Sequence, residues 1–168
     1  MDNLTRKNCV VNDESLDYSL HTFKEFPVFM GCTEKDFSTD LHKNMEWVIS
    51  SNSGIVQIKE PLPLDVLYAE QHQSGTVGKL WENHHKEFAD FVTKHVKTEV
   101  LEIGGGHGIL AAKVNEKNAL KWTILEPNPT PRDDCPAEYI KGFFDESFEL
   151  PNGIDSVVHS HFFEHLYE

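Results

Sequence analysis

The residues best suited to chemistry form a glycine-rich stretch in the second half of the chain. An apolar run, Val100 to Ile103, contains the single acid Glu102 and leads directly into Gly104 to Gly108. The helix-forming run Ile109 to Ala112 follows, so the pattern predicts a strand, a tight turn and a helix. Glycine backbone lets a ligand approach closely, and a helix start has unpaired N–H groups. Such a turn can hold an anion or a nucleotide.

A second group of chemically capable side chains lies near the end of the sequence, at His161, Glu164 and His165. Histidine can act as a general base near neutral pH, and a neighbouring carboxylate can orient it. We take His165 as the first candidate base, with Glu164 orienting it and His161 as the alternative. These residues also match H-x-x-E-H, the inverzincin metalloprotease pattern, which needs a helix and a third zinc ligand. A role in packing or in solvating the next helix stays open.

Alternating strands and helices are expected to position both groups. Apolar residues recur at helical spacing from Leu80 to Val96, which predicts a helix over about 77 to 96 with Ser74 or Thr76 as its cap. His84 and His85 would then be surface or cap residues of this helix. Strands are expected at 99–103, 122–125, 139–140 and 154–158, with a helix from 108 to about 117. This alternation predicts a parallel α/β sheet that binds ligands at the carboxyl ends of its strands.

The first 62 residues lack this alternation. Apolar runs at 47–49 and 55–58 flank the turn-rich Ser50 to Gly54, which predicts a hairpin, and Phe26 to Met30 is a further apolar run. The proline-containing segment Glu60 to Leu64 interrupts regular structure and marks a boundary. We therefore expect a small strand-rich module over 1–62, a connecting segment and helix over 63–96, and an α/β unit over 97–168.

Composition excludes several classes of partner. The formal net charge of −13 opposes binding to nucleic acid or anionic lipid. No apolar stretch is long enough for a membrane span, and the N-terminus lacks a signal-peptide core, so a cytoplasmic protein is expected. Cys9, Cys32 and Cys135 are odd in number and widely spaced, which implies no disulfide framework.

Two nucleotide classes fit the glycine stretch. The run from Gly106 to Ala111 satisfies the looser dinucleotide pattern and is followed by an acid, Glu126, which permits an NAD-dependent enzyme. The alternative pattern is an acid, Glu102, placed before the alternating glycines Gly104, Gly106 and Gly108. This second pattern resembles the first motif of class I S-adenosylmethionine-dependent methyltransferases.

The resemblance extends along the chain. Trp122 to Pro127 looks like that family's second strand, which implies that Glu126 binds the ribose hydroxyls, since two acceptor oxygens suit a vicinal diol. It also implies adenine contacts at Phe144 and a fourth strand whose end, His159, faces the cofactor's transferred methyl group. The implied fold is a Rossmann-like sheet, here incomplete, with four predicted parallel strands.

The upstream half is similar to the sugar C-methyltransferases that act on nucleotide-linked sugars. This similarity implies that Tyr68, Ser74 and Thr76 contact the methionine end of the cofactor, although a helix cap remains an alternative. In that family a small zinc module comes first, with two Cys-x-x-Cys pairs. The corresponding positions here hold Cys9, Asn12, Ser50 and Ser53. Tetrahedral structural zinc needs Cys or His ligands, so we expect no zinc.

The resemblance implies methyl transfer from S-adenosylmethionine to a sugar or nucleotide-sugar in surface carbohydrate (capsule polysaccharide) biosynthesis, by O- or C-methylation. Two alternatives remain: a non-catalytic cofactor-binding or assembly module, and an NAD-dependent sugar-modifying enzyme. An incomplete parallel sheet leaves an edge without a partner, so self-association or marginal stability is expected. For the same reason we expect ligand binding to survive better than turnover in this chain.

Overall fold

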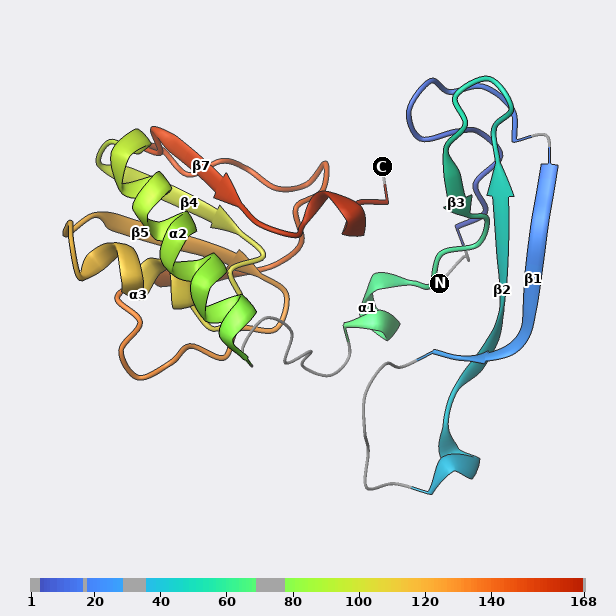
Figure 1. Cartoon of the computed structure of the whole chain (residues 1–168), viewed down its shortest axis with the longest axis horizontal. Helices are drawn as coiled ribbons and strands as arrows, with labels where there is room; N and C mark the ends of the chain where they lie inside the picture. Colours follow the sequence, from blue (N-terminus) through green and yellow to red (C-terminus); the bar gives the residue numbers. More distant parts are fainter. Residues whose placement is uncertain (1–3, 17, 29–35, 69–77, 168) are drawn as a thin grey trace. The chain divides into compact units, whose positions relative to one another are not determined.

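The computed structural model describes residues 4–16, 18–28, 36–68 and 78–167. Contacts divide the chain into two compact units. Unit 1 is Met1–Ala69 with Tyr167–Glu168, and unit 2 is Glu70–Leu166. Figure 1 labels most of their helices and strands. None of the helices in the described ranges is long and apolar enough to cross a membrane.

Unit 1 contains an antiparallel sheet with strand order β1-β2-β3. The strands are β1 Tyr18–Pro27, β2 His42–Ile49 and β3 Val56–Ile58, with a short 3₁₀ turn η1 at Phe37–Thr39 and a one-turn helix α1 at Leu64–Leu67. Trp47 pairs with Ile58, and Ile49 pairs with Val56. The predicted hairpin around residues 50–54 is therefore confirmed.

Two elements of unit 1 depart from the sequence-based expectation. Strand β1 starts well before the apolar run at Phe26, and its register shifts between Ser19 and His21 and again between Phe23 and Phe26. Such irregularities interrupt the alternation of period two by which a strand is recognised. The prolines of Glu60 to Leu64 do interrupt regular structure, with no helix or strand over residues 59–63, but Pro63 is also the N-cap of α1, a helix that the sequence did not predict. Proline's fixed φ suits the start of a helix.

The interior of unit 1 is partly polar. Ser50 and Gln57 are buried beside Cys9 and Val48. The Gln57 amide nitrogen donates to the Asn8 carbonyl at 3.3 Å, and its oxygen accepts from the Val10 amide at 3.2 Å. A buried amide needs such partners, so these bonds hold the N-terminal segment against the sheet.

Unit 2 contains a parallel sheet with strand order β6-β5-β4-β7. The strands are β4 Glu99–Ile103, β5 Lys121–Glu126, β6 Glu138–Lys141 and β7 Ser156–His159; the helices are α2 Lys79–His95 and α3 Ile109–Asn115, and a 3₁₀ turn, η2, covers Phe163–His165. The predicted mixed α/β class with a parallel sheet is confirmed.

Both helices of unit 2 pack on one face of the sheet (Figure 1). Ala89 and Val92 of α2 and Val114 of α3 are buried together with Val100 of β4 and Ile124 of β5. Apolar residues at helical spacing on α2 therefore meet continuous apolar runs on the central strands, which are buried on both faces. The opposite face buries Leu101, Ile103 and Leu125 under connecting segments.

The boundaries of helices α2 and α3 differ from the expected ones. Helix α2 begins at Lys79 with Gly78 at the N-cap position and no side-chain cap bond, and the predicted caps Ser74 and Thr76 lie outside the described residues. Helix α3 ends at Asn115, earlier than predicted. With seven residues it is too short to supply an anion site at its N-terminus.

Candidate functional site at the carboxyl ends of the parallel strands

The glycine loop turns the chain sharply between β4 and α3. Gly104, Gly106 and Gly108 all have left-handed backbone, with φ of +70°, +53° and +76°. Side chains disfavour this conformation, so alternating glycines are what the turn requires. The Gly104 amide donates to the Leu125 carbonyl at 2.9 Å, which fixes the start of the loop to β5.

The loop glycines differ in the space around them. A Cβ on Gly108 would collide with the Cys135 sulfur and lie 2.8 Å from the Tyr139 hydroxyl, and one on Gly105 would lie 2.7 Å from the Glu102 carboxyl carbon. A Cβ on Gly106 would meet nothing within 4 Å. At Gly105 and Gly108, neighbouring side chains therefore fill the space that a Cβ would need. At Gly106 this space is open.

Glu126, at the end of β5, lies directly against this open position. One carboxylate oxygen accepts from the Gly106 amide at 3.0 Å, and the other accepts from the Asn128 amide at 3.3 Å. The side chain is partly buried. Each carboxylate oxygen can accept a further hydrogen bond, so Glu126 can bind two neighbouring hydroxyl groups of a ligand.

Glu102 has a different environment from Glu126. It is buried, and it accepts from the Trp122 indole nitrogen at 2.9 Å. Burial, opposed by this hydrogen bond and reinforced by the charge of Glu126, raises the pKa of Glu102 to about 7. The carboxyl group lies beneath Gly105, so the predicted cofactor-binding acid supports the loop from inside.

The segment after β5 also holds the loop, which the sequence did not indicate. The Tyr139 hydroxyl donates to the Gly106 carbonyl at 3.2 Å, and burial followed by the Cys135 thiol raises the pKa of Tyr139. The Arg132 amide donates to the His107 carbonyl at 3.1 Å. The loop conformation is thus fixed from both sides before any ligand arrives.

Aromatic side chains and one unsatisfied nitrogen lie at the end of β7, whose last residue is His159. His159 Nδ1 is buried and has no hydrogen-bond partner among the described residues. The His159 ring centroid lies 4.1 Å from that of Phe163, and the Phe162 ring lies against Gly104. Phe144 is 42% exposed, with its ring centroid 6.0 Å from that of Phe162. A buried nitrogen without a partner is costly, so His159 is suited to bind a ligand atom.

A histidine from α2 meets the residue after β7, which corrects the expectation that His84 and His85 are surface or cap residues. Both are partly buried. His84 Nε2 and the Ser160 hydroxyl share a hydrogen bond of 2.9 Å. The His84 ring centroid lies 5.4 Å from that of His161, which in turn lies 5.1 Å from that of Trp81.

The expected arrangement within the final histidine stretch is not the one found. Glu164 lies 3.6 Å from Nδ1 of His161, and the His165 side chain is exposed with no hydrogen bond or ion pair to the described residues. The segment forms the short turn η2, and no group of three His, Cys, Asp or Glu among the described residues could hold a metal. Within the described part of the chain, the metalloprotease pattern thus lacks the helix and the third ligand that it requires.

In unit 1, the four positions of the zinc-type pattern belong to two facing turns. The Cys9 thiol and Ser53 hydroxyl share a hydrogen bond of 3.2 Å, and Ser50 is fully buried. That hydrogen bond is the main cause that lowers the pKa of Cys9. One thiol, one amide and two hydroxyls do not fit a structural zinc ion, which prefers four sulfur or nitrogen ligands.

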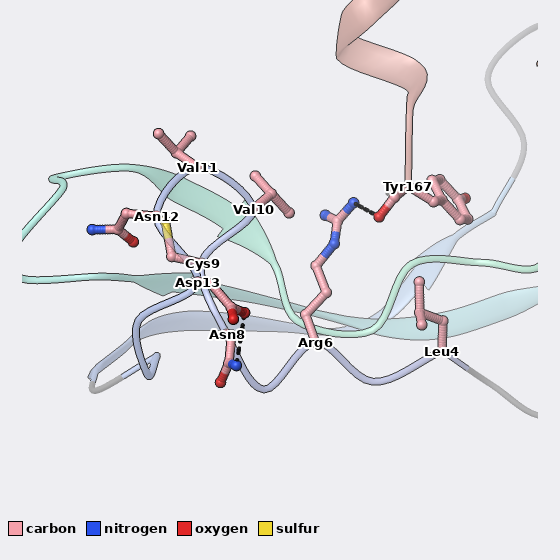
Figure 2. A pocket seen from close by; sticks show the side chains of 9 residues that line it. All are labelled: Leu4, Arg6, Asn8, Cys9, Val10, Val11, Asn12, Asp13 and Tyr167. Carbon is pink, nitrogen blue, oxygen red and sulfur yellow. Dashed lines mark hydrogen bonds between the residues drawn. The ribbon is translucent and has the colours of Figure 1, made fainter. Parts of the chain in front are cut away.

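An open pocket of about 500 Å³ lies beside the first of these turns (Figure 2). In Figure 2, Arg6 points to the Tyr167 carbonyl, to which it donates at 3.3 Å, and Val10 and Val11 flank the opening. Burial lowers the pKa of Arg6. None of the residues predicted to bind the cofactor lines this pocket.

The remaining predicted cofactor contacts lie outside the glycine loop. Tyr68 is the residue after α1, where its amide donates to the Leu64 carbonyl at 2.8 Å. Ser74 and Thr76 lie outside the described residues. Comparison with known proteins adds no name to this site, since no protein-family model matches the chain and no curated protein sequence matches it.

Proposed function

We propose that unit 2 binds S-adenosylmethionine on the glycine loop, and that the chain transfers its methyl group to a sugar or nucleotide-sugar. The observation that carries this proposal is the pairing of Glu126 with the open backbone of Gly106. In the proposed complex, Glu126 accepts the ribose hydroxyls. The finer fold class, a Rossmann-like methyltransferase sheet, belongs to the same proposal.

The chain's residues fit this cofactor at three further points. Gly106 leaves room for the ribose portion, the exposed ring of Phe144 can cover the adenine, and the unpartnered Nδ1 of His159 can bind a polar atom near the end of β7. When bound, S-adenosylmethionine supplies a methyl group already activated by its sulfonium. The protein's part is then to align the acceptor and exclude water.

An NAD-dependent enzyme is the competing assignment for the same loop, and titration calorimetry separates the two. We expect the full chain to bind S-adenosylhomocysteine and not NAD. Glu126→Ala should weaken S-adenosylhomocysteine binding at least about tenfold, because two charge-assisted hydrogen bonds are lost. Glu138→Ala, on the exposed surface of neighbouring β6, is the matched control and should bind normally.

Substitution at Gly106 gives an independent check on the same titration. Gly106→Val places a side chain in open space and strains the backbone at φ +53°, so it should abolish binding both by occupying the ligand's position and by distorting the loop. Binding of NAD alone would overturn the proposal. If the chain binds neither S-adenosylhomocysteine nor NAD, the assembly module becomes the favoured assignment.

A further inference from the structure

The contact between α2 and the end of β7 lies outside the predicted set of catalytic residues. His84 Nε2 and Ser160 Oγ are 2.9 Å apart, and both side chains are partly buried. Ser160 directly follows His159, whose strand is paired with Ile103 immediately before the glycine loop. The pair therefore lies at the carboxyl edge of the sheet, beside the strand end that the proposed function places next to the methyl group.

The surroundings hold His84 in one place. Its ring is stacked on Phe88 at a centroid distance of 5.8 Å and lies edge-on to Trp81 at 5.5 Å. His161 is held in the left-handed conformation, with φ of +51°, although it is not glycine. Such strain persists where packing over-determines the backbone, and it often occurs at functional sites.

The charges around His84 favour a neutral imidazole. Burial, followed by the neighbouring His85 and His161, lowers the pKa of His84, while Glu87 on the same helix opposes this change. Glu164 is the remaining acid in the cluster, and it faces His161. A neutral imidazole at physiological pH can accept a proton.

We infer that His84 and Ser160 form a proton-accepting pair for the methyl acceptor, and that this acceptor is a neutral hydroxyl group. The inference rests on the proposed function and extends it to the acceptor side of the same site. A hydroxyl can donate a hydrogen bond to Ser160 Oγ in the bound complex, whereas a C–H group cannot. O-methylation therefore fits the pair better than C-methylation.

The proton and electron transfers balance without another reactant. The acceptor oxygen forms the new bond to the methyl carbon, and the carbon–sulfur bond breaks with its electron pair remaining on sulfur. The hydroxyl proton passes to Ser160 Oγ as the Ser160 proton passes to His84 Nε2. One positive charge is thus lost at sulfur and gained at His84, so the imidazolium forms as the repelling sulfonium disappears.

Imidazole NMR of the ¹⁵N-labelled full chain tests whether His84 lies beside the sulfonium and whether its Nε2 is free to accept a proton. We expect unprotonated Nε2 on neutral His84. We also expect its pKa to fall by about one pH unit more with S-adenosylmethionine than with S-adenosylhomocysteine, because only the former carries the sulfonium charge. His84→Gln assigns the resonance, and Ser160→Ala should remove the tautomer preference while leaving affinity for S-adenosylhomocysteine within about twofold.

His95, at the far end of α2, is the internal control and should respond equally to both ligands. Equal pKa values of His84 in the two complexes, or a protonated Nε2 in neutral His84, would overturn the inference while the proposed function stands. If neither ligand binds, the proposed function fails and the inference fails with it.

Discussion

At the scale of single residues, the two acids of the candidate site have separate tasks that the sequence alone could not assign. The resemblance to class I methyltransferases implied that Glu102 and Glu126 both contact the cofactor. In the structure Glu126 bonds to the loop's open backbone, while Glu102 is buried against Trp122. Side-chain direction at the end of a strand depends on what packs beneath it, and that information is not local in sequence.

The raised pKa of Glu102 predicts a pH-dependent stability. The folded-state pKa of about 7 lies above the ordinary value of 4.5 for a glutamate, so this group's contribution to stability is fully present below pH 4.5 and is lost as pH rises through 7. The total change is about 3 kcal/mol. Glu102→Gln keeps an acceptor for Trp122 and cannot ionise.

Urea unfolding of the wild type and Glu102→Gln at pH 4.5 to 8 measures this effect. Between pH 4.5 and pH 8, the free energy of unfolding of Glu102→Gln should rise by about 2–3 kcal/mol relative to that of the wild type. Exposed Glu138→Gln should show no such gain. If the difference in free energy of unfolding between Glu102→Gln and the wild type does not change with pH, Glu102 is not a buried, protonated carboxyl group.

At the scale of elements, local periodicity predicted the parts whose pattern is continuous. Helix α2, strands β4 and β5 and the hairpin of β2 and β3 were all predicted, because each has an uninterrupted apolar pattern or a turn with characteristic residues. Strand β1 was not predicted because its bulges break that pattern. The contact between His84 and Ser160 joins two elements far apart in sequence, so no local pattern could reveal it.

We predict that the two facing turns of unit 1 can bind zinc once cysteines are introduced at the other three positions. Asn12→Cys, Ser50→Cys and Ser53→Cys together with native Cys9 give four thiolates, and the Cys9–Ser53 hydrogen bond of 3.2 Å shows that the turns already face each other. We expect the triple variant to bind one Zn²⁺ per chain and to unfold at a higher temperature with metal.

Metal analysis and the visible spectrum of the Co²⁺ form provide the measurement. The wild type should bind no zinc, and adding Cys9→Ser to the triple variant should remove the tetrahedral cobalt bands. Stoichiometric zinc in the purified wild type would show that the present residues do form a site. A triple variant that takes up no metal would show that the turns are too far apart or too rigid.

At the scale of the whole molecule, the two edges of the parallel sheet differ. Strand β6 carries the exposed charges Glu138 and Lys141, which discourage pairing with another strand. Strand β7 contains no Asp, Glu, Lys or Arg, and Val157 is 52% exposed. Among the described strands, only β4 pairs with β7. The strand β7 is therefore the edge through which a second copy would add.

This difference predicts self-association that one charge can weaken. Light scattering coupled to size exclusion should show the apparent mass of the wild type rising with concentration, and Val157→Lys should reduce that rise, because a lysine on an edge strand opposes pairing. Leu80→Lys adds the same charge at an exposed position of α2 and should not change association. Equal weakening by both variants would assign the effect to net charge, and an unchanged mass in Val157→Lys would exclude β7 as the contact.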